Sequence, residues 1–289
     1  MPELPEVETV MRGLAPVLVG RRIDGVELRR LGLRFPFPDN FVKDLTGRRI
    51  LGLSRRAKYI LVALDNDSSL LVHLGMTGRF TAVGKSLAKF YYGSDTAETG
   101  TGTHDHVVLT LDDGVKVVYT DPRRFGIMDM VQAQDYQNHK LLKSIGVEPL
   151  GNEFNGDYLA KKFHGKKAPL KAALLDQRII AGLGNIYVSE ALHRIGLSPK
   201  RAAKTIARKI QVLDELVRHV RDILNEAILV GGSTLQDFAG ADGAEGAYQE
   251  RFAVYDRQGE PCQKRGCGGT IRRIVQSGRS TFYCPTCQK

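Results

Sequence analysis

The chain has 289 residues, and its 42 lysines and arginines against 32 acidic residues leave a formal net charge of +10. This length allows two or three units with their own cores, and the charge favours a polyanionic partner over a small neutral substrate. No apolar stretch of about 18 residues exists to span a bilayer, and the acidic, proline-interrupted N-terminus is unlike a secretory signal. We therefore expect a cytoplasmic protein without a membrane partner.

The chain begins with an amphipathic helix. Apolar residues recur at helical spacing over residues 7–18, and Pro5 suits the first helical turn. Met followed by Pro is normally trimmed, which would leave Pro2 with a free secondary amine. Such an α-amino group has a pKa of about 7.7 to 8.0 and is partly nucleophilic at neutral pH. Its attack on an aldehyde-like carbon gives a cationic iminium, an electron sink for elimination. By itself, however, an N-terminal proline is equally an ordinary chain start.

Residues 20–133 have the pattern of a mainly antiparallel β-sandwich. Short β-type runs follow one another, and Asp113-Gly114 reads as a hairpin turn between two of them. The runs cover residues 48–53, 59–64, 70–74, 107–111 and 115–119. Residues 84–103 are rich in Gly, Ser and Thr and are expected to form a mobile surface loop.

From about residue 134 to 231 the period is helical. A long amphipathic helix is predicted over residues 206–227, preceded by two shorter helices at 170–180 and 186–194. Ser198-Pro199 offers an N-cap and first turn to the following helix. Helical pairs with glycine in the turn commonly dock on DNA, but a plain helical hairpin fits these residues as well. Residues 233–254 look like a linker or flexible loop.

All four cysteines lie close to the C-terminus. Cys262 and Cys267 form a C-x4-C pair, and after sixteen residues Cys284 and Cys287 form a C-x2-C pair. Two such pairs match the spacing of a tetrahedral structural zinc site, although two disulfides are the alternative. Residues 255–289 carry seven basic and two acidic residues, or half of the excess charge. Because four thiolates leave no open position for water, this basic ribbon suits phosphate contacts better than catalysis.

Six motifs carry a resemblance to a known family. They are residues 2–8 (PELPEVE), 55–59 (RRAKY), 73–76 (HLGM), 121–126 (DPRRFG), 182–187 (GLGNIY) and the four-cysteine ribbon. In this order, and spanning nearly the whole chain, they resemble the formamidopyrimidine-DNA glycosylase family. The C-x4-C pair departs from the two-residue spacing of many members, which should alter the turn and leave the zinc site intact.

The resemblance implies an α+β fold in three parts. These are an N-terminal helix with an antiparallel β-sandwich (residues 1–133), a helical domain with a helix-two-turn-helix (134–235), and a lesion loop with a zinc ribbon (236–289). It also implies one structural Zn2+ and no organic cofactor. The partner would be double-stranded DNA that contains oxidised bases or abasic sites, bound by a monomer, at the nucleoid if the source is bacterial.

The implied activity is excision of oxidised purines, chiefly 8-oxoguanine and formamidopyrimidines, followed by β,δ-elimination at the abasic site. Pro2 would attack C1′ of the damaged nucleotide, and Glu3 would act as general acid and base on the sugar. Glu6 would support that site, although an acid in the first turn of a helix is an equally good structural explanation. Lys58 would act in β-elimination or hold the flanking phosphate, and Arg279 is the candidate for δ-elimination.

The resemblance also assigns contacts to DNA. Met76, Arg123 and Phe125 match a wedge that fills the gap left by a flipped base; without the resemblance, Met76 and Phe125 would be taken as core residues. Asn185 would bind phosphate at a helix start.

His104 and Lys167 match positions that contact the DNA backbone. His104, Asp105 and His106 could instead be read as a metal site. Residues 237–250 correspond to the loop that senses the oxidised base. Two other functions remain open: the same chemistry on oxidised pyrimidines, and a DNA-binding protein without catalysis.

Overall fold

The computed structural model describes residues 2–84, 102–233 and 246–289. The chain divides into two compact units, Met1–Lys143 with Val230–Ala247 and Ser144–Leu229 with Tyr248–Lys289. The division at residues 133 and 235 that the sequence suggests stays a prediction. Most of the expected loop at 84–103 lies outside the described residues. Part of the expected lesion loop at 237–250 lies outside them as well. No helix in the described ranges is both long and apolar enough to cross a membrane.

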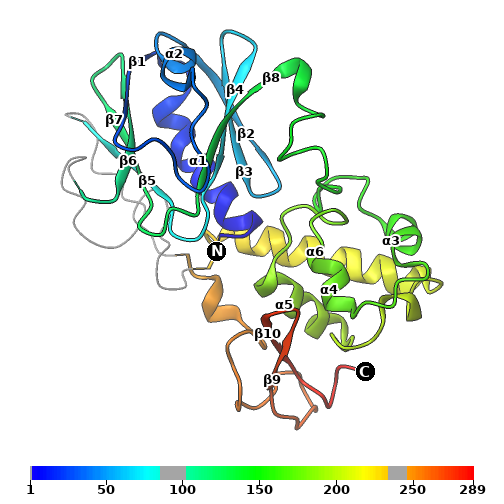
Figure 1. Ribbon diagram of the computed structural model, residues 1–289. Helices are drawn as coiled ribbons and strands as arrows, with labels where there is room; N and C mark the ends of the chain where they lie inside the picture. The colour runs from blue at the N-terminus through cyan, green and yellow to red at the C-terminus, as the bar shows by residue number, and fades with distance from the viewer. Residues whose placement is uncertain (1, 85–101, 234–245) are drawn as a thin grey trace. The chain divides into compact units, whose positions relative to one another are not determined.

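Unit 1 is a β-sandwich with its first helix in the core (Figure 1). One sheet has the strand order β1-β6-β7-β5 and the other β2-β3-β4-β8, and all neighbouring strands are antiparallel. Apolar residues of α1 and of both sheets form one buried cluster. The elements are α1 (Leu4–Leu18), β1 (Ile23–Leu28), α2 (Phe41–Leu45), β2 (Ile50–Arg56), β3 (Tyr59–Leu64), β4 (Ser68–His73), β5 (Arg79–Val83), β6 (Asp105–Leu111), β7 (Lys116–Thr120), β8 (Ile127–Gln132) and the 3-10 helix η1 (Ala133–Asp135).

Unit 2 combines a helical bundle with a two-stranded ribbon. Helix α6 packs against both α3 and α5, and α5 also packs against β10. The elements are α3 (Gly156–Phe163), α4 (Leu170–Leu175), α5 (Asn185–Ile195), α6 (Ile210–Leu229), β9 (Arg272–Gln276) and β10 (Arg279–Tyr283), with the 3-10 helices η2 (Ala203–Thr205) and η3 (Tyr248–Arg251). The fold class expected from the sequence is therefore confirmed.

Some of the helices, strands and turns predicted from the sequence are present in the structure, and others differ. The first helix, the strands near residues 50 and 60 and the turn at Asp113-Gly114 all form, with Gly114 at φ +81°. Strands β1, β5 and β8 were not predicted from the sequence. The helix expected after Ser198 begins only at Ile210. Residues 199–209 instead form turns and the 3-10 helix η2, and the carbonyls of Pro199 and Arg201 accept from the backbone N–H groups of Lys171 and Leu170.

Candidate active site

The N-terminal residues are held by two buried carboxylates. Pro2 lies two residues before the start of α1, and Glu3 between them caps this helix. The Glu3 carboxylate accepts from the backbone N–H of Glu6, and the Glu6 Oε2 accepts from the backbone N–H of Glu3 at 2.8 Å. Both side chains are at most 4% exposed. This capping box satisfies helix-end donors reciprocally, and it fixes the backbone next to Pro2.

Glu6 also binds a segment distant in sequence. Its Oε1 accepts from the backbone N–H of Ser233 at 2.8 Å and from the Ser233 hydroxyl at 3.1 Å. The neighbouring Gly232 has φ +81°, and a Cβ there would lie 2.8 Å from the same oxygen. A residue other than glycine would thus strain the backbone and crowd the carboxylate. One carboxylate therefore joins the start of α1 to the chain that leads into residue 234.

Lys58 lies in the two-residue turn between β2 and β3, where Ala57 has φ +53°. Its side chain is only 6% exposed. The adjacent Arg55 donates to Glu8 of α1 at 2.8 Å and to the Ala57 carbonyl at 3.0 Å, which fastens the turn to the first helix. The sequence predicted a functional lysine here, and the structure makes it an ordered and largely buried one.

His73 was not singled out from the sequence, although it lies in the HLGM motif. It pairs with Tyr59 across β3 and β4, with the two rings 5.0 Å apart. Burial lowers the pKa of His73 to about 4, and the positive charges of Lys58 and Arg34 act in the same direction. Its Nδ1 accepts from the backbone N–H of Gly75 at 3.0 Å, so the neutral ring carries its proton on Nε2.

The three side chains expected to fill a gap in DNA come from two adjoining loops. Met76 follows β4, and Arg123 and Phe125 follow β7. Met76 is 37% and Phe125 43% exposed, and the Arg123 guanidinium lies 4.9 Å from the centre of the Phe125 ring. A Cβ at Gly75 would collide with the Phe125 backbone, so the loops meet backbone to backbone. Two apolar side chains and one guanidinium thus stand exposed at one place.

The residues around His104 act as structural supports. His104 is exposed, and its carbonyl accepts from the backbone N–H of Asp121 at 3.0 Å. Asp105 accepts from Gly102 and Thr120, while the His106 Nε2 contacts the Asp121 carbonyl at 2.9 Å. Within residues 2–84, 102–233 and 246–289, the four cysteines are the one metal-binding group of three or more candidate ligands. The alternative metal site at His104 is therefore not formed.

In unit 2, two side chains hold the strand that begins with Arg279. The Asn185 amide at the start of α5 donates to the Ser280 carbonyl at 3.0 Å. Lys171, which is fully buried in α4, donates to the same carbonyl at 2.8 Å and to the Thr281 hydroxyl at 2.7 Å. Arg279 itself is exposed. The role of Lys171 was not predicted from the sequence. A lysine within an apolar helical stretch was the signal that could have indicated it.

Lys167 is exposed in the segment between α3 and α4. Its neighbour Lys166 lies 3.9 Å from Asp176, which leaves Lys167 as the more accessible of the two cations.

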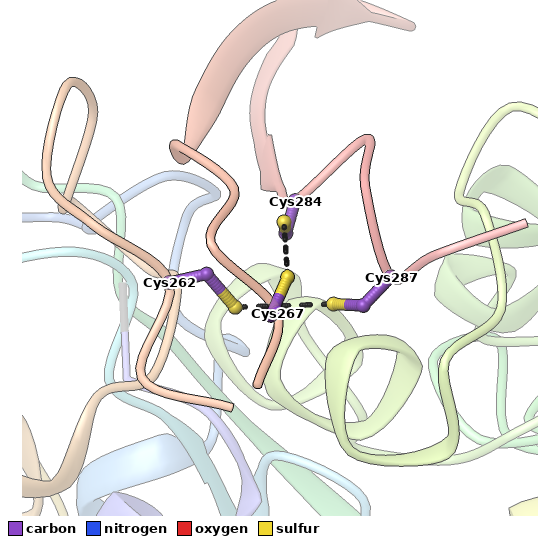
Figure 2. Close-up of side chains that lie close together, drawn as sticks. All are labelled: Cys262, Cys267, Cys284 and Cys287. Carbon is purple, nitrogen blue, oxygen red and sulfur yellow. Dashed lines mark hydrogen bonds between the residues drawn. The ribbon is translucent and has the colours of Figure 1, made fainter. Parts of the chain in front are cut away.

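The four cysteine sulfurs gather in one place (Figure 2). All lie within 4.8 Å of one another, and the Sγ–Sγ distances are 3.8 Å for Cys262 and Cys287 and 3.5 Å for Cys267 and Cys284. A tetrahedral zinc with Zn–S bonds of about 2.3 Å requires sulfurs about 3.8 Å apart. The geometry fits one zinc ion, and the cysteines are not paired as disulfides.

Helix α5 supports the ribbon from one side. The His193 Nε2 lies 3.3 Å from the Cys262 sulfur. The carboxylate of Glu190, one turn earlier, accepts from the backbone N–H groups of Ala253, Val254 and Tyr255 at 2.8 to 3.1 Å. One helix thus begins at Asn185 beside β10 and ends beside the zinc ligands.

Comparison with known proteins agrees with this geometry. Residues 1–128 match the formamidopyrimidine-DNA glycosylase N-terminal domain, 145–239 its H2TH domain, and 259–289 the zinc finger found in FPG and IleRS. The H2TH match resolves the choice between a helical hairpin and a helix-two-turn-helix.

Relatives and solved structures cover the whole chain. The formamidopyrimidine-DNA glycosylases of Beijerinckia indica and Ruegeria pomeroyi are 55% and 52% identical, each over 100% of both chains. A crystal structure of MutM (Fpg) from Thermus thermophilus matches with a TM-score of 0.84 and 39% identity over 99% of this chain and 98% of that one. Lactococcus lactis Fpg with abasic-site DNA matches with a TM-score of 0.84 and 32% identity over 99% of both. This chain belongs to the formamidopyrimidine-DNA glycosylase family.

Proposed function

We propose that this protein excises oxidised purines from duplex DNA and then cleaves the abasic strand by β,δ-elimination, with Pro2 as the nucleophile. The observation that carries the proposal is the capping box of Glu3 and Glu6 directly behind Pro2. It fixes the position of the nucleophile's neighbours before any substrate arrives, and such preorganisation is what covalent catalysis requires.

Each step has a group suited to it. After removal of Met1, the Pro2 nitrogen attacks C1′ and the bond to the damaged base breaks, which leaves a cationic iminium on the opened sugar. Glu3, at a helix N-terminus that favours its anionic form, exchanges protons with the sugar. The iminium acidifies the 2′ position, so loss of that proton expels the 3′ phosphate. A second elimination then expels the 5′ phosphate, and hydrolysis of the remaining iminium frees Pro2.

Lys58 and Arg279 supply positive charge for the two eliminations. Lys58 lies in a turn that is ordered by Arg55, so its placement at the substrate carries no large ordering cost. Arg279 begins a strand whose second residue is held by Asn185 and Lys171. A guanidinium so positioned suits a phosphate leaving group.

The remaining predicted residues bind DNA. Met76 and Phe125 replace lost stacking, and Arg123 hydrogen-bonds the orphaned base. His104, Lys167 and the start of α5 at Asn185 take backbone phosphates. The zinc shapes the ribbon and supplies no chemistry, because four sulfurs fill its coordination shell. We place the protein in the cytoplasm at the nucleoid, since its relatives are bacterial and its substrate is DNA.

Borohydride trapping on an 8-oxoguanine:C duplex tests the proposal. The wild-type protein should form a covalent adduct with the DNA, because reduction fixes the iminium. Pro2→Gly and a form with an uncleaved N-terminal extension should trap at least about 100-fold less, since a general nucleophile's loss costs this much or more. Equal trapping by the extended protein would overturn the N-terminal mechanism. A thymine-glycol duplex, run in parallel, would reveal a preference for oxidised pyrimidines if it traps faster.

A further inference from the structure

A fully buried carboxylate lies beneath the exposed residues Met76, Arg123 and Phe125. Asp121 is 0% exposed, and both of its carboxylate oxygens have donors. Oδ1 accepts from the Thr77 hydroxyl at 2.6 Å, and Oδ2 accepts from the backbone N–H of Gly126 at 2.8 Å. The Tyr119 hydroxyl lies 3.4 Å from Oδ2. Asp121 thus binds both loops at once.

Thr77 extends this network to Arg123. Its hydroxyl donates to Asp121 and accepts from the backbone N–H of Arg123 at 3.2 Å. A hydroxyl has one proton and two lone pairs, so both bonds can exist together. The result is a chain of bonds from Arg123 through Thr77 to Asp121. Met76 directly precedes Thr77, and Phe125 directly precedes Gly126.

The backbone of Asp121 is anchored in the sandwich. Its N–H donates to the His104 carbonyl at 3.0 Å, and its carbonyl accepts from the backbone N–H of Arg124 at 3.1 Å. The same carbonyl is 2.9 Å from the His106 Nε2, which must be the donor because a carbonyl only accepts. The backbone of Asp121 is therefore fixed to the start of β6.

Three glycines allow the loops to approach this carboxylate. A Cβ at Gly78 or Gly126 would collide with the Tyr119 hydroxyl, and a Cβ at Gly75 with the Phe125 backbone. Gly75 also has φ +68°, which disfavours any other residue. The two loops are thus tightly packed around Asp121 and Tyr119.

We propose that Asp121 and Thr77 are positioning residues that hold Met76, Arg123 and Phe125 ready to enter the base stack. This inference rests on the proposed wedge function of those three side chains. An exposed side chain on a mobile loop would have to be ordered during insertion, at an entropic cost that slows the step. Charge-assisted hydrogen bonds to a buried carboxylate remove that cost beforehand, because they are short and strong.

Thr77→Val and Thr77→Ser form the matched pair that tests this. Valine keeps the shape of threonine but lacks the hydroxyl, whereas serine keeps the hydroxyl. The readout is the ratio of two single-turnover rates, excision from an 8-oxoguanine:C duplex and cleavage of a single-stranded abasic oligonucleotide. Thr77→Val should lower that ratio about tenfold, the effect of one lost charge-assisted hydrogen bond, and Thr77→Ser should retain the wild-type ratio.

A second signal reports insertion itself. With 2-aminopurine next to the lesion, the fluorescence rise that accompanies unstacking should slow in Thr77→Val by the same factor as excision. Thr77→Ala provides a second variant without the hydroxyl should valine fold poorly, and thermal melting checks each protein. An unchanged ratio in both Thr77→Val and Thr77→Ala would overturn the inference.

Phe125→Ala separates this inference from the proposed function. If Phe125→Ala lowers the duplex-to-single-strand ratio but the Thr77 variants do not, the wedge stands and the role of Asp121 and Thr77 is wrong. If Phe125→Ala leaves the ratio unchanged, the wedge assignment itself fails, and the positioning role fails with it.

Discussion

The two ends of the chain differ in what stabilises the residues proposed to act there. The N-terminal site is fixed by buried carboxylates, Glu3, Glu6 and Asp121, above a large apolar core shared by a helix and two sheets. The C-terminal ribbon has a core of four buried residues, one of which is a zinc ligand, Cys284. Polar side chains fix the geometry at both ends, since Asn185, Lys171 and Glu190 bind the ribbon, but apolar burial supplies most of the stability only where the core is large. The ribbon lacks such a core, so its metal must supply what apolar burial supplies at the other end.

Zinc removal should expose this difference most strongly. Binding of structural zinc to small domains contributes on the order of 10 kcal/mol at neutral pH. Chelation should therefore abolish hydrogen-exchange protection in β9 and β10 and leave β3 and β4 protected. Mass spectrometry of both regions, with and without chelator, measures this. Protected ribbon amides in zinc-free protein would show that the small core suffices, and zinc add-back is the control for reversibility.

Acid should instead weaken the N-terminal unit. Because the folded pKa of His73 is about 4 and its ordinary value is 6.5, the unfolded chain binds the extra proton between these values. Stability thus falls as the pH drops from 6.5 towards 4, by about 2 to 3 kcal/mol at pH 4.5. Lys58 and Arg34 add to the effect by repelling the imidazolium.

His73→Gln should remove that acid loss. Urea unfolding at pH 7 and 4.5, followed by hydrogen exchange in β3 and β4, gives the difference between the two proteins. His164→Gln is the matched control, since His164 is an exposed side chain. The same acid sensitivity in wild type and His73→Gln would assign the loss to other groups.

Glu6→Gln tests whether the carboxylate network matters as the comparison implies. The carboxylate accepts from Glu3 and twice from Ser233, and an amide replaces one accepting oxygen by a donor. At least one buried N–H then lacks its acceptor, at a cost of about 1 to 3 kcal/mol.

Both thermal stability and excision of 8-oxoguanine should fall, because the same bonds hold the backbone beside Pro2. Glu215→Gln, at a half-exposed position on α6, is the control and should change neither. Wild-type behaviour of Glu6→Gln would reduce Glu6 to a first-turn acid that favours the helix dipole.

The sequence predicted most reliably what depends on neighbouring residues. Helix α1, the paired strands β2 and β3, and the cysteine cluster follow from local periodicity and spacing. The family motifs added Lys58, Arg279 and the exposed side chains Met76 and Phe125, which apolar character alone assigns to a core.

The residues that hold these side chains in place by hydrogen bonds could not be predicted in the same way. Lys171 meets Thr281 over a separation of 110 residues, and Thr77 meets Asp121 over 44. Such bonds exist only once the sheets and helices are in place. A buried lysine or aspartate therefore reads in the sequence as an ordinary polar residue, and its partner cannot be named. The helix start predicted at Ser198 was wrong for a similar reason, because this segment forms turns that bond to the distant backbone of Leu170 and Lys171.

His193→Ala should have the smallest effect of these changes. It tests whether a hydrogen bond to a cysteine ligand stabilises the zinc site. A zinc-bound thiolate can only accept, so the His193 Nε2–H donates to Cys262, 3.3 Å away. Loss of an outer hydrogen bond to a metal ligand typically lowers metal affinity about tenfold or more. Zinc transfer to a chromogenic chelator should therefore be about tenfold faster in His193→Ala, and wild-type speed is expected of His164→Ala. Equal rates in all three proteins would mean that the four thiolates alone hold the ion and that His193 adds nothing to its retention.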